Sequence, residues 1–250
     1  MKTSSFLLVL LLLVPGAAMS LEDQSVSWIY WIKPKPGMER DFEQGVKAHH
    51  SWRREQGDPW AWLVWRIGTG PQTGTYAIAT FNHRWADFDS PPVSPAKAVE
   101  NYRDTIEPYV ESVRVEQYLY HADISNVPAD LPPREFSVTE MIEVHVSRER
   151  DFIDAITKID LAIKQTAWPN YYEWYELDYG GQQPTYARVR LLWSWNDLEP
   201  DEKSLRDVLE QAYGHREAAR IADAFNRSVS RRYNRTALMQ PNLSYFPGAS

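Results

Sequence analysis

Charged and aromatic side chains are concentrated in two segments of the sequence, residues 170–177 and 185–195, both expected as strands. In a β-strand every second side chain points to the same face. If the segments pair as a hairpin symmetric about the two glycines at 180–181, Glu173 lies opposite Arg188. One face of this hairpin then carries Tyr171, Glu173, Tyr175, Tyr186, Arg188 and Arg190.

This polar face predicts a pocket for a small aromatic or anionic organic ligand. Arg188 and Arg190 could hold an anionic substrate or a developing oxyanion. Glu173 could act as a general base if burial raises its pKa. Tyr175 and Tyr186 would orient the ligand. The alternative is a structural ion pair or a face that meets water, because cross-strand charge pairs are common and contribute only about 0.2–1 kcal/mol.

Three histidines are further candidates. His145 lies at the end of an expected strand with the parity of Glu143, so it could reach the same pocket as a proton carrier, or it could be an ordinary surface histidine. His49 and His50 lie on an expected helix, where adjacent side chains point about 100° apart and cannot jointly bind one metal ion. One of them could line a pocket of the first half; the alternative is a helix surface. Candidate neighbours in that pocket are Trp31, Trp62 and Tyr76.

The predicted site therefore has two groups of residues. The catalytic group is Glu173, His145 and Arg188, and the ligand-binding group is Arg190, Tyr175, Tyr186, Tyr171, His49 and His50. The sequence contains no metal-ligand spacing, no serine nucleophile elbow and no glycine-rich phosphate-binding motif. We therefore expect no metal and no cofactor.

Short motifs recur at one fixed distance along the chain. Thr75-Tyr76-Ala77 returns as Thr185-Tyr186-Ala187, and Arg40-Asp41-Phe42 returns as Arg150-Asp151-Phe152, in both cases 110 residues later. A tryptophan follows each Thr-Tyr-Ala segment at the same spacing. A repeat of this kind indicates that one structural unit occurs twice.

The order of expected elements is the same in both copies. Strands are predicted at 26–32, 60–67, 75–81, 113–121, 137–146, 170–177, 185–195 and 230–239, and helices at 38–55, 96–110, 148–166 and 201–226. Each copy is thus a β-α-β-β-α-β, or ferredoxin-like, unit. A proline-rich linker at 126–134 separates the first half (21–125) from the second (135–250).

The expected fold class is α+β, with the two ferredoxin-like repeats packed sheet to sheet as one α/β barrel. The helices of each unit cover one face of its sheet, so the other face must be buried against the sister sheet. Strands that are apolar on both sides, such as residues 60–65, fit this arrangement.

With this element order and the repeated Arg-Asp-Phe and Thr-Tyr-Ala motifs, the chain resembles the dimeric α/β-barrel superfamily, fused here in one chain. The superfamily includes antibiotic-biosynthesis monooxygenases, polyketide cyclases, haem-degrading enzymes, chlorite dismutases and many stress proteins. The resemblance implies a cofactor-independent enzyme of the cyclase, lyase or monooxygenase kind, or a non-catalytic ligand-binding or stress-response module. A haem protein is the third option. Chlorite dismutase relatives use an axial histidine from a helix of the second half, and His215 is the histidine on an expected helix there. The alternative for His215 is a solvated helix face, because arginine and glutamate residues surround it.

The first 20 residues have the pattern of a secretory signal peptide. Lys2 precedes a short apolar run, residues 6–14, and small residues follow it. That run is shorter than the roughly 20 residues a spanning helix needs. We therefore expect a protein exported to a bacterial periplasm or the extracellular space, without a stable membrane span after cleavage.

Composition bounds the partners. The sequence has no cysteine, so packing rather than disulfides must stabilise the exported fold. A formal net charge of −7 argues against binding to nucleic acids. The expected partner is a small-molecule ligand, and a homodimer is compatible with the superfamily.

Overall fold

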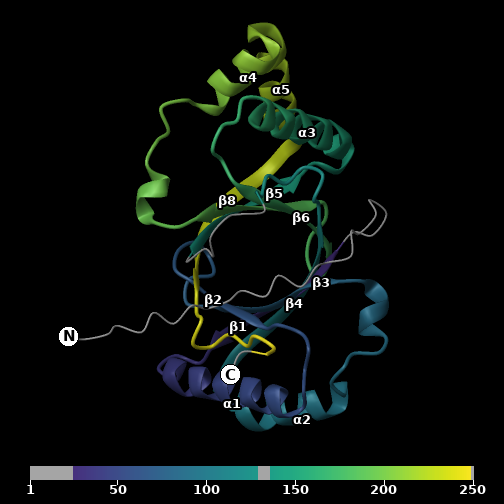
Figure 1. Cartoon of the computed structure of the whole chain (residues 1–250), viewed down its shortest axis with the longest axis vertical. Helices are drawn as coiled ribbons and strands as arrows, with labels where there is room; N and C mark the ends of the chain where they lie inside the picture. The colour runs from purple at the N-terminus through teal and green to yellow at the C-terminus, as the bar shows by residue number, and fades with distance from the viewer. Residues whose placement is uncertain (1–24, 129–135, 249–250) are drawn as a thin grey trace, which may run out of the picture.

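The computed structural model describes residues 25–128 and 136–248, which form an eight-stranded barrel with helices on its outside (Figure 1). The first half consists of β1 (Val26–Pro34), α1 (Glu39–Glu55), β2 (Leu63–Ile67), β3 (Tyr76–His83), α2 (Pro95–Thr105) and β4 (Val110–Tyr120). The second half consists of β5 (Phe136–Val144), α3 (Glu149–Gln165), β6 (Tyr172–Tyr179), β7 (Thr185–Leu192), α4 (Leu205–Tyr213), α5 (His215–Ser228) and β8 (Val229–Met239).

The strands follow the closed order β1-β3-β2-β8-β5-β7-β6-β4, and every neighbouring pair is antiparallel. Each half contributes four adjacent strands in the ferredoxin-like order, which confirms the tandem repeat and the α/β barrel. The halves join at two seams, where β2 pairs with β8 and β4 pairs with β6. The two sheets therefore meet edge to edge as well as face to face.

The helices lie on opposite outer sides of the barrel. In Figure 1, α1 and α2 cover the first sheet at the bottom, while α3, α4 and α5 cover the second sheet at the top. None of the helices within the described ranges is long and apolar enough to cross a membrane.

The repeated motifs are core contacts that attach each first helix to its sheet. Phe42 packs against Tyr76 with ring centroids 4.9 Å apart, and Phe152 packs against Tyr186 at 4.8 Å. All four side chains are buried. The recurrence of Arg-Asp-Phe and Thr-Tyr-Ala thus reflects packing in two equivalent helix–sheet interfaces.

The long helix expected at 201–226 was wrong as a single element. Gly214 has a φ of +76°, a conformation that only glycine adopts without strain, and it ends α4 and starts α5 in a new direction. Two shorter helices therefore cover the second sheet where the first half has α2.

The expected register of the second hairpin was also wrong, by one residue. Trp174, not Glu173, pairs with Arg188. A shift of one residue moves each side chain to the other face of its strand. Glu173 therefore faces the barrel interior, whereas Arg188 faces the helices.

Two sequence-based predictions lie largely outside the described residues. Residues 1–20, the predicted signal peptide, lie outside the described ranges. Of the linker at 126–134, only the first three residues lie within them. Of these, Asn126 exchanges backbone hydrogen bonds with Tyr172 of β6. The domain boundary itself stays a prediction.

Candidate functional site

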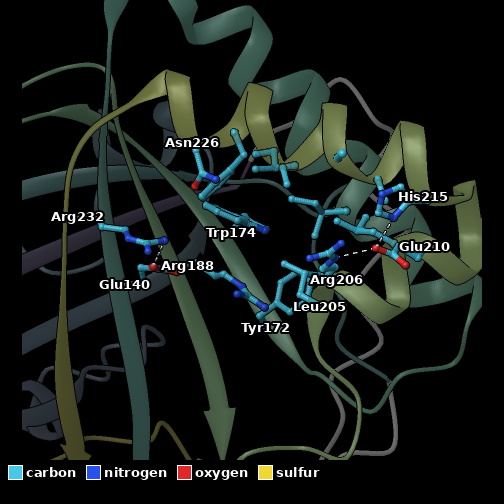
Figure 2. Close-up of a pocket in the computed structure, with 17 residues that line it drawn as sticks. Glu140, Tyr172, Trp174, Arg188, Leu205, Arg206, Glu210, His215, Asn226 and Arg232 are labelled. Carbon is cyan, nitrogen blue, oxygen red and sulfur yellow. Dashed lines mark hydrogen bonds and ion pairs between the residues drawn. The ribbon is translucent and has the colours of Figure 1, made fainter.

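A cavity of about 490 Å³ lies between the second sheet and α3, α4 and α5 (Figure 2). Strands β5 to β8 contribute its floor, and the three helices contribute its walls and roof. The floor residues are Glu140, Tyr172, Trp174, Arg188 and Arg232. Concave sites of this size that are mostly apolar, with a few polar groups, are where proteins bind small molecules.

Arg188 is the central charged group of the floor. Its Nη2 donates a hydrogen bond to Asn170 Oδ1 at 3.0 Å, and its guanidinium lies 4.5 Å from the centre of the Tyr172 ring. Burial lowers the pKa of Arg188 below its usual range, because the positive charge is poorly solvated there. The side chain nevertheless remains protonated, because arginine loses its proton only at very high pH.

The other charges around the cavity have partners. Glu140, the cross-strand neighbour of Arg188, lies 3.8 Å from Arg232, and Glu210 accepts a hydrogen bond from Arg206 at 2.7 Å. No carboxylate of the described chain lies within 4.0 Å of the Arg188 guanidinium. The Glu140 carboxylate also acts on Arg188 through space, but Arg232 shares it, so the two guanidiniums keep one excess positive charge on the cavity floor.

Aliphatic and aromatic side chains make up most of the remaining surface. They come from all three helices and from β6: Ile156, Ile159, Leu205, Leu209, Phe225 and Trp174. Such walls favour the apolar body of a ligand rather than a small hydrated ion.

Tyr172 is held beneath Arg188 by a buried chain of polar contacts. Its hydroxyl donates to Asp160 Oδ1 at 2.9 Å, and Lys164 Nζ lies 2.8 Å from Asp160 Oδ2. Burial and the Asp160 carboxylate raise the pKa of Tyr172 above its usual value, so the phenol is neutral. The ring therefore offers a fixed apolar platform to the guanidinium.

His215 and Glu210 lie together at the rim of the cavity, as Figure 2 shows. The His215 Nδ1 atom is 3.0 Å from Glu210 Oε1. A carboxylate bound to one ring nitrogen orients the imidazole and leaves the other nitrogen, Nε2, free for chemistry. The His215 side chain is 73% exposed, so this pair belongs to the mouth of the cavity rather than to its floor.

Of the residues predicted for the catalytic and ligand-binding groups in the second half, Arg188 lines this cavity, and His215, named for the haem option, lies at its mouth. Glu173 and Tyr175 line the barrel interior, on the opposite face of the sheet. Arg190 shares the face of Arg188 but donates to the Asp197 carbonyl at 3.2 Å, outside the cavity. The polar face that was expected to hold all six residues is thus divided between the outer cavity and the barrel interior.

The other predicted residues of this half are also outside the cavity. Tyr186 belongs to the core, and its hydroxyl donates to Glu149 at 2.9 Å. The Tyr171 ring packs edge-on against Trp193. His145 is exposed beyond the end of β5, because η3 (Val146–Arg148) turns the chain away there. The pocket that these residues were expected to share with Arg188 does not form.

His49 and His50 do line a cavity, in the first half. Both are buried, and they face about 430 Å³ of space between the first sheet and α1 and α2, together with Trp62. Trp31, one of the expected neighbours, points into the barrel instead.

The residues that the sequence analysis missed include Tyr172 and Trp174, which line the cavity, and Asp160, which accepts a hydrogen bond from the Tyr172 hydroxyl. Tyr172 and Trp174 have the correct parity for the face of Arg188 once the hairpin is centred on residue 181. Asp160 could have been found from its offset of 110 residues to His50, which is buried at the equivalent place in α1. No group of three or more potential ligand side chains within residues 25–128 and 136–248 could hold a metal ion.

Solved structures with the same fold include several enzymes at low sequence identity. A proposed monooxygenase from Lactobacillus acidophilus is 10% identical, with 91% of this chain and 99% of that chain covered and a TM-score of 0.52. An anthrone oxidase-like protein is 10% identical, with 92% and 97% covered and a TM-score of 0.53. A chlorite dismutase from Candidatus Nitrospira defluvii is 8% identical, with 88% and 93% covered and a TM-score of 0.55.

These similarities confirm the fold that the resemblance implied, a dimeric α/β barrel built from two ferredoxin-like halves in one chain. The sequence itself matches no protein-family model, and no curated protein matches it significantly. Folds of this kind carry many unrelated reactions, so function must be argued from the cavity.

Proposed function

We propose that the protein binds a small organic anion with an apolar body in the cavity of its second half. The observation that carries the proposal is the Arg188 guanidinium, which is partly buried on the cavity floor with no carboxylate within 4.0 Å among the described residues. Desolvating a charge is costly unless it is paired. A ligand carboxylate or enolate would supply the missing partner through charge-assisted hydrogen bonds.

A titration with one anionic probe tests this proposal. Ionised 2-naphthoate combines a carboxylate with an apolar ring system. We expect Arg188→Met to weaken 2-naphthoate binding about ten- to hundredfold in calorimetric titration, the usual range for a lost charged hydrogen bond.

Arg190→Met is the matched control, because Arg190 lies on the same strand and face but outside the cavity. It should leave the affinity for 2-naphthoate within about twofold, the size of a small surface effect. Equal losses in both variants, or an unchanged affinity in Arg188→Met, would contradict the proposal.

The catalytic form of this proposal is a cofactor-independent acid–base enzyme acting on the bound anion. Glu173 and His145, which the sequence favoured for proton transfer, lie outside the cavity. His215 replaces them, because Glu210 orients its ring at the cavity mouth. Turnover of the bound anion that disappears in His215→Asn, while 2-naphthoate still binds, would support an enzyme. A non-catalytic binding module would bind 2-naphthoate without turnover in the wild type and in His215→Asn alike.

Haem binding is a second candidate, favoured by the contact between His215 and Glu210. His215, whose Nδ1 is held by the Glu210 carboxylate, would hold the haem iron through Nε2, and the neighbouring cavity has polar and apolar walls. Arg188, on the floor, would bind an anionic group of the porphyrin edge or of a second ligand. Bound haem would supply one-electron and oxygen chemistry.

Haem titration distinguishes this candidate. A Soret band that forms with stoichiometric haem in the wild type and in His145→Ala, but shifts or disappears in His215→Ala, would support axial ligation by His215. Absence of a Soret shift in the wild type would remove the candidate and leave the anion-binding proposal intact.

We also propose that the protein is exported with loss of residues 1–20. The support is the short apolar run at 6–14 followed by small residues. Intact-mass measurement of periplasmic protein from a bacterial host should give a chain that begins near residue 19 or 21, and Leu10→Arg should abolish processing. A full-length chain retained in the cytoplasm would contradict export.

A further inference from the structure

The first half contains its own cavity at the place equivalent to the second-half site. It measures about 430 Å³, and its lining includes Tyr30, His49, His50, Trp62, Ile78 and Tyr102. An adjoining hollow of about 230 Å³ adds Trp28, Trp60 and Phe88 and shares Tyr30 and Trp62 with it. Aromatic rings thus dominate this side of the molecule.

The two cavities differ in charge at two equivalent, paired positions. Ile78 pairs with Tyr30 in the first half, as Arg188 pairs with Glu140 in the second. Ile78 and Arg188 are 110 positions apart, and so are Tyr30 and Glu140. The aliphatic side chain of Ile78 therefore stands where the second cavity has its guanidinium. A ligand in the first half meets no anion-binding group on the floor.

The half-buried cation of the first cavity, Arg53, is neutralised. Arg53 Nη1 lies 2.6 Å from Asp58 Oδ2, and the Arg53 guanidinium stacks 4.2 Å from the Trp62 ring. Asp58 is itself buried and accepts a second hydrogen bond, from Trp62 Nε1 at 3.0 Å. The remaining charged lining residues, Arg103 and Glu107, are exposed at the rim and have opposite signs.

The hydrogen bonds of the two histidines define their protonation. His49 Nδ1 contacts Asn101 Oδ1 at 2.7 Å while its Nε2 accepts from Arg53 Nε at 3.2 Å, so both nitrogens are occupied. His50 Nδ1 lies 2.6 Å from the Leu243 carbonyl oxygen, which can only accept, so Nδ1 carries the proton.

The hydrogen bond at Nδ1 fixes the tautomer of His50, and burial lowers its pKa to about 3, so the ring is a neutral imidazole with a lone pair on Nε2. No donor within the described residues contacts Nε2, and His50 lines the cavity. The site therefore offers a hydrogen-bond acceptor among aromatic walls and no uncompensated charge.

We propose that the first-half cavity binds an uncharged aromatic molecule that donates a hydrogen bond, such as a phenol, to His50 Nε2. The aromatic walls supply stacking surface, and the exposed Val99 and Val113 form an apolar entrance. The two halves then bind different classes of ligand, neutral in the first and anionic in the second.

Calorimetric titration with two matched probes tests the proposal. 2-Naphthol is uncharged at pH 7.5 and donates through its hydroxyl, whereas 2-methoxynaphthalene has the same rings and no donor. The wild type should bind 2-naphthol about five- to tenfold more tightly, as expected for one hydrogen bond. In His50→Asn the side-chain amide can still donate to the Leu243 carbonyl but leaves no acceptor at Nε2, so this preference should disappear.

Two cavity-filling variants locate the binding site. Ala98 lines the first cavity and Ala222 the second, both from helices. Ala98→Phe should abolish 2-naphthol binding, while Ala222→Phe and Arg188→Met should leave it within about twofold, the size of a remote effect. These controls separate this proposal from the anion-binding site.

Three outcomes would overturn the proposal. The first is equal wild-type affinity for the two probes, with no change in His50→Asn. The second is 2-naphthol binding that survives in Ala98→Phe, and the third is no detectable 2-naphthol binding to a wild type with a cooperative melting transition.

Discussion

Glu116 and Arg235 occupy equivalent positions in the two halves, and both lie buried inside the barrel. Glu116 of β4 pairs with Ile29 of β1, as Arg235 of β8 pairs with Thr139 of β5. Both contact Trp31: its indole Nε1 donates to Glu116 at 2.6 Å, and the Arg235 guanidinium lies 4.0 Å from its ring centre. Duplication has thus placed opposite charges on either side of one shared tryptophan.

Loss of the buried charge of Glu116 should destabilise the barrel. Glu116→Gln keeps an acceptor for Trp31 but removes the negative charge near Arg235, so the free energy of unfolding should fall by about 1–3 kcal/mol. Urea denaturation measures this change. Glu111→Gln, on the same strand but in the exposed pair with Lys33, should change the free energy by less than about 1 kcal/mol. Similar effects of the two substitutions would contradict the proposed role of the interior charge.

Gly180 should be indispensable at the seam between β6 and β4. Its φ is +96°, and a Cβ atom there would lie 2.1 Å from the Val115 carbonyl oxygen. Gly180→Ala should therefore destabilise by about 2–5 kcal/mol, which combines backbone strain with a steric clash. Gly74→Ala is the control, because its φ is +82° but nothing lies within 4 Å of the added atom. Thermal unfolding should show a clearly smaller loss in the control.

The buried histidines of α1 should make stability depend on pH. Burial, the largest cause for both, lowers the pKa of His49 to about 4 and that of His50 to about 3, against 6.5 when unfolded. Below pH 6.5 the unfolded chain binds protons that the folded chain does not. The free energy of unfolding should therefore fall as pH drops, by about 1.4 kcal/mol per pH unit for each histidine until its folded pKa is reached.

Urea denaturation between pH 7.5 and pH 5 measures that slope. The double variant His49→Asn/His50→Asn should have a flatter pH profile than the wild type, whatever its absolute stability. His145→Asn replaces an exposed histidine and should retain the wild-type profile. A double variant with an unchanged slope would show that both histidines titrate alike in the folded and unfolded states.

Tyr172 should position Arg188 through its ring rather than through its hydroxyl. Tyr172→Phe removes the hydrogen bond to Asp160 but keeps the ring under the guanidinium, so stability should fall by about 1 kcal/mol while 2-naphthoate affinity changes less than about threefold. Tyr172→Leu removes the ring and should weaken 2-naphthoate binding about tenfold. If Phe and Leu have the same effect on affinity, the ring does not position Arg188.

The architecture could be predicted from the sequence because the repeat fixes it redundantly. Phe42 and Tyr76 recur at the same offset as Phe152 and Tyr186, and each pair closes the same helix–sheet contact. Element order and the closure of two sheets around one core follow from that duplication. The helix break at Gly214 was the main error, because an isolated glycine inside an amphipathic pattern does not by itself end a helix.

The register of the hairpins could not be predicted from the pattern of side chains. Barrel strands are buried on both faces, so apolar residues such as Trp62 and Leu63 follow one another without alternation. In β6 and β7 polar groups also occur on both faces, with Glu173 inside the barrel and Arg188 outside. Register is weakly specified under these conditions, and the geometry of the turn decides it.

The contact between His215 and Glu210 was equally inaccessible from the sequence. Residues five apart in one continuous helix point about 140° away from each other. The change of direction at Gly214 brings them to 3.0 Å instead. The contact between His215 and Glu210 could be predicted only if the helix break at Gly214 were known.

The two seams of the barrel have a consequence for the chain as a unit. Because β2 pairs with β8 and β4 with β6, each half closes the exposed strand edges of the other. Either half produced alone would have two unpaired edges and an uncovered apolar sheet face, a combination that promotes association with further copies. The intact chain contains its own partner, which leaves the two outer cavities free to diverge without breaking a symmetry between subunits.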